Sequence, residues 1–165
     1  MLAWMAFLSL VLSILIFGTN DLIVARSNTL EIINRNDVMW RYLAAFAYAT
    51  VALTTVAALA FMLSVFAENS IGPIVSTISI VIVFTILSEM QIPLYDRTVK
   101  PYLFTSHMLG WKGFFYLKAD AEGVSIPGTI ENLPAVLRSM SILLGYIVLF
   151  AGSAVVVFKK KDILS

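Results

Sequence analysis

The sequence contains no cysteine and only one histidine, His107, in 165 residues. Disulfides, thiolate metal sites and cysteine catalysis are therefore excluded, and a lone imidazole is a poor metal site. None of the eight glycines is followed by Lys-Ser or Lys-Thr, so the chain has no phosphate-binding loop. We expect no catalytic residues, no cofactor and no metal, and any nucleotide hydrolysis has to occur on a partner chain.

Charge is also scarce, because only 13% of the residues are charged whereas 60% are apolar. A soluble domain with this composition would lack a polar surface. The formal net charge is +1, which offers no electrostatic reason to expect a nucleic-acid partner. The composition therefore predicts a partner of another kind, the lipid bilayer.

The longest apolar stretch runs from Tyr42 to Ser88 with Glu68 as its only formal charge. A bilayer core about 30 Å thick is crossed by about 20 apolar residues, so this stretch suffices for two crossings. The break falls where a charge, an amide and two helix breakers lie together. These polar and breaking residues are Glu68, Asn69, Ser70, Gly72 and Pro73. The pattern predicts a transmembrane helical hairpin.

Two further apolar stretches complete the predicted fold, an all-α integral membrane protein with four transmembrane helices in one domain, 1–165. We expect spans at about 2–18, 42–66, 71–91 and 136–158, and polar loops at 19–41 and 92–135. The first stretch could instead be a signal peptide. However, no Lys or Arg precedes Arg26, and Gly18-Thr19-Asn20 is a poor cleavage site.

The two loops differ in character. Loop 19–41 mixes charges of both signs with aliphatic residues, which suits a connector with a short interfacial helix. Loop 92–135 contains an aromatic, apolar segment that is too short to span and is interrupted by glycines. Such a segment predicts a re-entrant or interfacial helical element before the last span. Its candidate interfacial residues are Tyr102, His107, Trp111 and Phe115.

The two central helices differ in side-chain size. The helix at 42–66 is rich in Ala and Thr, which favours close packing among other helices, although alanine is also simply a good helix former. The helix at 71–91 carries Ser76 and Ser79 on one face. These hydroxyls could line a path through the membrane or bond back to their own helix carbonyls.

The orientation of the chain is ambiguous from charge alone. The cluster Lys159-Lys160-Lys161 directly after the last span is typical of a cytoplasmic end. With four spans, that choice also places the turn at Glu68 in the cytoplasm and both loops outside. Counted as far as Arg138, the two outer loops carry eight Lys and Arg residues against the three lysines, so the positive-inside rule by itself favours the inverted topology.

Five features in this order resemble a known class of proteins: a small-residue helix, a short acidic turn, a β-branched helix, an aromatic outer element and a final helix with a basic end. The segments are Phe61–Phe66, Glu68-Asn69-Ser70, the helix at 71–91, Pro101–Trp111 and Val157–Leu164. Together, over about residues 40–165, they resemble the C-terminal two thirds of ABC transporter permeases of the type-2 exporter class. The resemblance implies a cytoplasmic C-terminus in a bacterial or archaeal cytoplasmic membrane.

The same resemblance implies a function. The chain would be the permease subunit of an exporter for a hydrophobic or amphiphilic solute, paired with a second permease chain and an ABC-type ATPase. The turn Glu68-Asn69-Ser70 is then the candidate ATPase contact, and Ser76 and Ser79 are candidate path-lining residues.

Departures from the class leave alternatives open. The class ordinarily has two more spans before the segment that 2–18 would match, so we expect a fragment, a truncated product or a shortened relative. A second hypothesis is a non-transporting membrane scaffold or assembly subunit. A third is a membrane enzyme built on Glu89 and His107.

Overall fold

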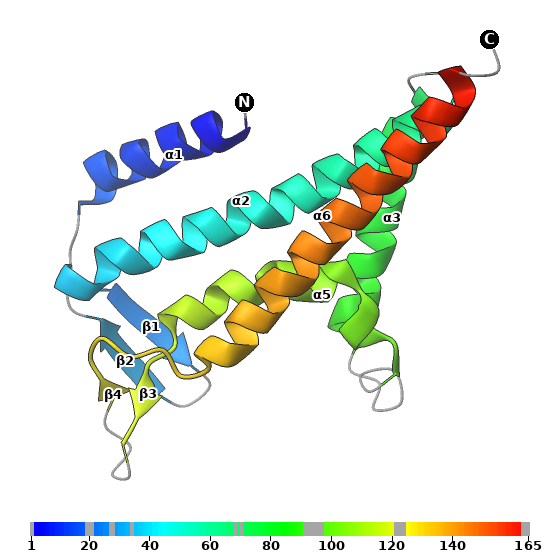
Figure 1. The fold of residues 1–165 in the computed structure, drawn as a ribbon. Coiled ribbons are helices and arrows are strands. Elements are labelled where there is room, and N and C mark those ends of the chain that lie inside the picture. The colour runs from blue at the N-terminus through cyan, green and yellow to red at the C-terminus, as the bar shows by residue number, and fades with distance from the viewer. Residues whose placement is uncertain are drawn as a thin grey trace. The chain divides into compact units, whose positions relative to one another are not determined.

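The structure is a computed structural model that describes residues 2–18, 22–26, 29–33, 35–67, 69, 71–90, 98–120 and 125–162. It is mostly helical, with two small antiparallel sheets (Figure 1). In chain order the elements are α1 (Leu2–Phe17), β1 (Leu22–Arg26), β2 (Thr29–Ile33), α2 (Arg35–Phe66), α3 (Ile71–Glu89), the 3-10 helix η1 (Lys100–Tyr102), α5 (Phe104–Met108), the 3-10 helix η2 (Leu109–Phe115), β3 (Lys118–Ala119), β4 (Ser125–Ile126) and α6 (Leu133–Asp162).

The chain divides into two compact units. One comprises Met1–Thr50 and Gly110–Arg138 and contains both β-hairpins, so we call it the hairpin unit. The other comprises Val51–Leu109 and Ser139–Ser165 and is called the helical unit. The long helices α2 and α6 each contribute residues to both units.

Three helices are long and apolar enough to cross a membrane: α2, α3 and the Leu133–Lys160 part of α6. The shortest, α3, has 19 residues and is therefore about 28 Å long, close to the thickness of the hydrocarbon core. Three of the four predicted spans are thus matched by suitable helices. α1 is a helix as expected, but its 16 residues reach only about 24 Å, and a fourth crossing stays a prediction.

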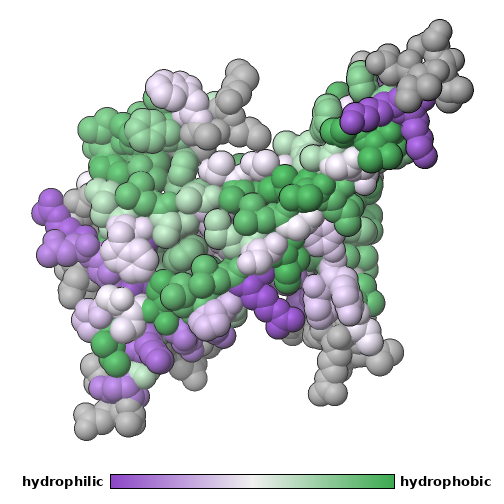
Figure 2. Space-filling view, in the orientation of Figure 1, coloured by the Kyte–Doolittle hydropathy of each residue, from purple (hydrophilic) through white to green (hydrophobic). Residues whose placement is uncertain are grey.

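Large apolar side chains cover the outside of these helices, as the green surface in Figure 2 shows. On α3, Ile71 is 73% exposed and Ile78 is 55% exposed; on α6, Val148 is 72% exposed. Water would strongly disfavour so much contiguous apolar surface, whereas lipid does not. The exposed surface therefore agrees with the composition in indicating a multi-pass membrane protein.

Hydroxyl side chains within the long helices mostly bond to their own backbone. The hydroxyls of Thr77, Thr85 and Ser88 on α3 donate to carbonyl oxygens four residues earlier, at 2.7 Å in each case. On α2, Thr50 and Thr55 make the same type of bond at 3.0 and 3.1 Å. These bonds satisfy hydroxyl groups that would otherwise be costly in hydrocarbon.

The predicted short interfacial helix between residues 20 and 41 is wrong. Strands β1 and β2 form an antiparallel hairpin there, with Leu22 opposite Ile33 and Arg26 opposite Thr29. Both strands are rich in aliphatic residues, which suit a pleated surface. In addition, α2 begins at Arg35, so the helix that contains the predicted span starts seven residues before Tyr42.

One stripe of α2 is buried within the chain. Its residues are spaced alternately four and three apart, as one helix face requires: Arg41, Ala45, Tyr48, Ala52, Thr55 and Leu59. Only 17% of the apolar window of this helix is buried, however. We expected α2 to be packed among other helices, and within the chain this holds only for the buried stripe.

The expected helical element before the last span is present as η1, α5 and η2, and its relation to the membrane stays a prediction. Within the helical unit, the aromatic ring of Phe104 on α5 contacts the rings of Phe84 on α3 and of Tyr146 and Phe150 on α6. The Thr105 hydroxyl lies 2.7 Å from the Ser88 hydroxyl. α5 therefore packs against α3 and α6.

The hairpin unit has a small core of its own. Ile33, Val38 and Leu117 are buried together, with Phe115 packed against them. Close beside it, Gly113 allows a tight approach to α6, because an added Cβ would lie 2.5 Å from Val136 Cγ2. The segment 113–117 therefore holds the start of α6 against the hairpin unit.

We predict that Gly113→Ala lowers the stability of the hairpin unit by about 1–3 kcal/mol, because the added methyl group has to displace buried Val136. The thermal unfolding midpoint in detergent measures the loss. Gly145→Ala on α6 is the matched control, since an added Cβ there meets nothing within 4 Å. Equal midpoints for the two variants would show that the close approach is unimportant.

Candidate ligand cavity and polar clamp

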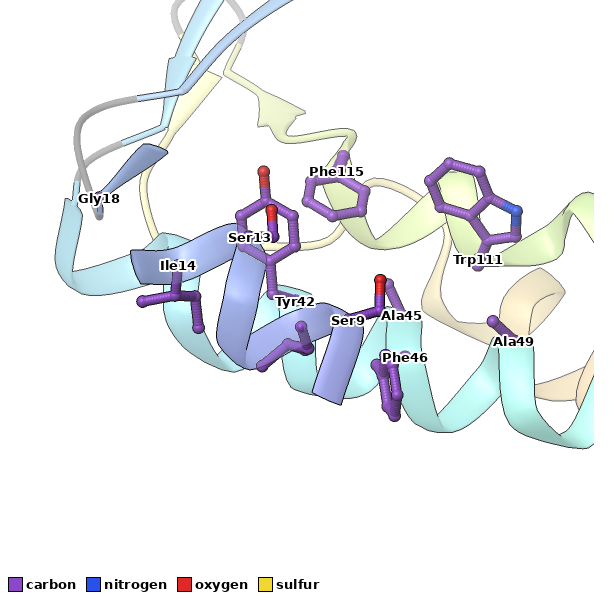
Figure 3. Close-up of a pocket in the computed structure, with 11 residues that line it drawn as sticks. Ser9, Ser13, Ile14, Gly18, Tyr42, Ala45, Phe46, Ala49, Trp111 and Phe115 are labelled. Atoms are coloured by element: carbon purple, nitrogen blue, oxygen red, sulfur yellow. The ribbon is translucent and has the colours of Figure 1, made fainter. Parts of the chain in front are cut away.

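The hairpin unit contains an apolar cavity of about 570 Å³, a volume within the range of small-molecule sites. Figure 3 shows that its walls come from three elements: α1, the first half of α2 and η2. The lining residues are Ser9, Leu10, Ser13, Ile14, Gly18, Tyr42, Ala45, Phe46, Ala49, Trp111 and Phe115.

Three aromatic rings form one wall of this cavity. Phe115 makes edge-to-face contacts with Tyr42, at 5.5 Å between ring centroids, and with Trp111, at 6.1 Å. Each such pair contributes about 0.5–1.5 kcal/mol beyond the burial of its area. The contacts join η2 to α2, so the aromatic wall is fixed in place before any ligand binds.

The chemistry of the lining favours binding over catalysis. Its polar side-chain groups are the hydroxyls of Ser9, Ser13 and Tyr42 and the indole N–H of Trp111, and none of the lining residues is acidic, basic or histidine. A serine without a neighbouring base is a weak nucleophile. The cavity suits an apolar body with one or two groups that hydrogen-bond to hydroxyls.

A buried arginine lies one residue from the cavity wall. Arg41 is 0% exposed, and its Nε and Nη2 donate to Asp37 Oδ2 at 2.9 and 2.7 Å. Nη2 also donates to the Thr129 carbonyl at 2.7 Å, and Nη1 donates to the Phe114 carbonyl. We call Asp37 and Arg41 the polar clamp, because together they join α2 to η2 and to the loop before α6.

The Asp37 carboxylate accepts hydrogen bonds from other groups besides Arg41. Asp37 Oδ2 accepts the Gly128 N–H at 3.1 Å, and Oδ1 accepts the indole N–H of Trp40. Gly128 has a positive φ of 79°, a conformation that favours glycine. The guanidinium carbon of Arg41 also lies 4.8 Å from the centre of the Trp40 ring. A buried ion pair stabilises a fold when further hydrogen bonds satisfy its donors and acceptors, and the Arg41 guanidinium makes four hydrogen bonds here.

The four predicted interfacial residues fall into different units. Trp111 and Phe115 line the cavity of the hairpin unit. Tyr102 and His107 belong to the helical unit, where the Tyr102 carbonyl accepts the Tyr146 hydroxyl. Whether any of the four lies at a membrane interface stays a prediction.

His107 has a structural setting. Its Nε2 lies 3.0 Å from the Pro101 carbonyl, which can only accept, so Nε2 carries a proton. Nδ1 lies 3.1 Å from the Ser139 hydroxyl, which donates to it in the neutral ring. Among the described residues, no three His, Cys, Asp or Glu side chains are close enough to share a metal ion.

Of the candidate ATPase-contact turn, Glu68 and Ser70 lie outside the described residues. Asn69 is exposed, and its Oδ1 accepts the Gly72 N–H at 2.9 Å, which caps the start of α3. The candidate path-lining residues Ser76 and Ser79 are both exposed on α3. Their hydroxyls are therefore open to lipid, to a solute or to a second chain.

Sequence reasoning missed the polar clamp, because Asp37 and Arg41 were assigned to a loop. Their spacing of four residues, with Trp40 between them, is typical of a helix and was the available signal. Asn132 caps the last helix, since its Oδ1 accepts the Ala135 N–H at 3.2 Å.

The sequence matches no protein-family model, no curated protein and no solved structure. The case for a function therefore depends on the composition, the apolar helices and the cavity.

We predict that the cavity binds a fatty acid brominated in its chain, which quenches Trp111 fluorescence in detergent solution. Ala49→Phe should reduce the quenching at least threefold, because the added ring fills the cavity. Ala47→Phe is the control, since Ala47 is exposed on the same helix and does not line the cavity. Quenching that survives Ala49→Phe unchanged would place the probe elsewhere.

We predict that Arg41→Met lowers the stability of the hairpin unit by about 3 kcal/mol, because Asp37 then keeps a partly buried charge without its partner. Arg41→Lys should recover only part of the loss, since an ammonium group cannot reproduce the planar fork. Hydrogen exchange of the Gly128 and Glu131 amides and the unfolding midpoint report the effect. Exposed Arg138→Met serves as the control and should change stability by less than about 0.5 kcal/mol.

Proposed function

We propose that this chain is the membrane-spanning permease subunit of an ATP-driven transporter of the ABC type. It exports a hydrophobic or amphiphilic solute, or extracts one from the membrane, and the ATPase is a separate chain. The proposal combines the resemblance to type-2 exporter permeases with the apolar cavity of the hairpin unit. The cavity is the observation that carries it, because a solute of this class needs an apolar site within a membrane protein.

The proposed orientation follows from the number of crossings. If α2, α3 and α6 all cross, the turn after α2 and the C-terminal end of α6 lie on the same side of the membrane. The lysines after the last span assign that side to the cytoplasm. Asn69 is then available to a cytoplasmic ATPase, and the β-hairpins are outside.

A second permease chain completes the proposed transporter. The exposed face of α3 carries Ser76 and Ser79 among aliphatic residues such as Ile82 and Val83, which are 52% and 50% exposed. Small hydroxyl residues favour close helix contacts in lipid, where burial of apolar surface gives no driving force. This face is the part of the chain that we assign to the path between two permease chains.

The experiment is purification of the full chain from its native membranes, followed by a search for a co-purifying ATPase with a phosphate-binding loop. Asn69→Asp should lower the ATP hydrolysis of the complex at least threefold. Asp still caps α3, so the fold is kept while a charge is added at the contact. Asn132→Asp makes the same change at the cap of α6, far from the proposed contact in the sequence, and should leave hydrolysis unchanged.

Two results would contradict the proposal. One is purification without any ATPase, which would favour the scaffold or assembly subunit. The other is an equal loss of hydrolysis in both cap variants, which would assign the effect to the helices rather than to the turn.

A further inference from the structure

A second apolar groove lies within the helical unit and does not belong to the cavity described above. It has a volume of about 790 Å³ and is formed by the C-terminal turns of α2 and α6. Its walls are Phe61, Ser64 and Val65 on α2, and Ala154, Val155, Phe158 and Lys159 on α6. The groove is therefore apolar along most of its length and cationic at one end.

One polar group of the groove lining, the ammonium group of Lys159, suits an anionic headgroup. Lys159 is exposed, and a lysine stem can lie along an apolar wall while its ammonium group remains at the membrane surface. The Ser64 hydroxyl donates to the Phe61 carbonyl of its own helix at 2.8 Å, so it adds no donor to the groove. None of the lining residues is acidic.

Charge along the chain points to the same kind of occupant. Lys159 begins a run of three lysines that is followed by one acid, Asp162. Figure 2 shows hydrophilic side chains at the C-terminal end of α6 directly beside its apolar surface. Lysine clusters immediately after a membrane span attract anionic phospholipids, by about 1 kcal/mol per residue near the surface.

We propose that this groove binds one molecule of an anionic phospholipid. One acyl chain lies against Phe61, Val65 and Val155, and the phosphate group pairs with Lys159. The site is independent of the proposed transport function, since it needs neither an ATPase nor the cavity of the hairpin unit.

The test is native mass spectrometry of the full chain from detergent mixed with phosphatidylglycerol or with phosphatidylcholine of the same acyl chains. We expect phosphatidylglycerol to be retained at least fivefold better. Lys159→Gln should reduce its retention about fivefold, the factor that corresponds to about 1 kcal/mol. Lys160→Gln removes the same charge one residue away, outside the groove lining, and should reduce retention less than twofold.

A second pair of variants tests the apolar part of the groove. Val155→Trp should block the acyl chain and abolish selective retention, whereas Val156→Trp should not, because Val156 is exposed but does not line the groove. Equal losses in the two lysine variants would show general attraction to the lysine run and overturn the site. Equal retention of the two lipids would also overturn the site. So would a lipid-free dimer of the chain that Val155→Trp disrupts, because the groove would then bind a second chain rather than a lipid.

Discussion

A bilayer core offers no water to backbone N–H and C=O groups, so a chain can cross it only where these groups bond to one another. This constraint explains why the apolar stretches of the sequence become long helices. It also explains why Thr77 and Ser88 bond to carbonyls of their own helix. The apolar exterior of α3 and α6 suits lipid rather than water as the surrounding medium.

The ion pair of Asp37 and Arg41 lies at the start of α2, before the apolar stretch of this helix. The polar clamp closes the hairpin unit at the start of α2, where Arg41 reaches backbone carbonyls 73 and 88 residues later in the chain. The helix η2 contains Phe114, whose carbonyl accepts from Arg41, and also Trp111 and Phe115 of the cavity wall. The polar clamp and the aromatic wall therefore both hold η2 against α2. A cavity held in this way can accept a ligand with little loss of conformational freedom.

The sequence predicted the long helices well, because an apolar run of about 20 residues has one favourable structure in lipid. It also predicted a helical element before α6. It failed at the β1–β2 hairpin, where charged Arg26 and Glu31 interrupt the aliphatic pattern and favour a loop. The clamp was missed because Asp37 and Arg41 were assigned to a loop, and the carbonyl partners of Arg41, on Phe114 and Thr129, leave no mark in the sequence.

The central claim is that α3 and α6 lie in lipid. Because the chain has no cysteine, a single introduced cysteine is the only thiol that a labelling reagent can modify. Single cysteines at Ile78 and Val148, which are exposed on these helices, can be treated with a membrane-impermeant maleimide in intact vesicles. A cysteine at exposed Ile126 in the hairpin unit, with the vesicles opened, is the positive control. The account predicts labelling at position 126 alone until the membrane is dissolved in a denaturing detergent, after which all three react. Rapid labelling of positions 78 and 148 in intact bilayers would contradict it.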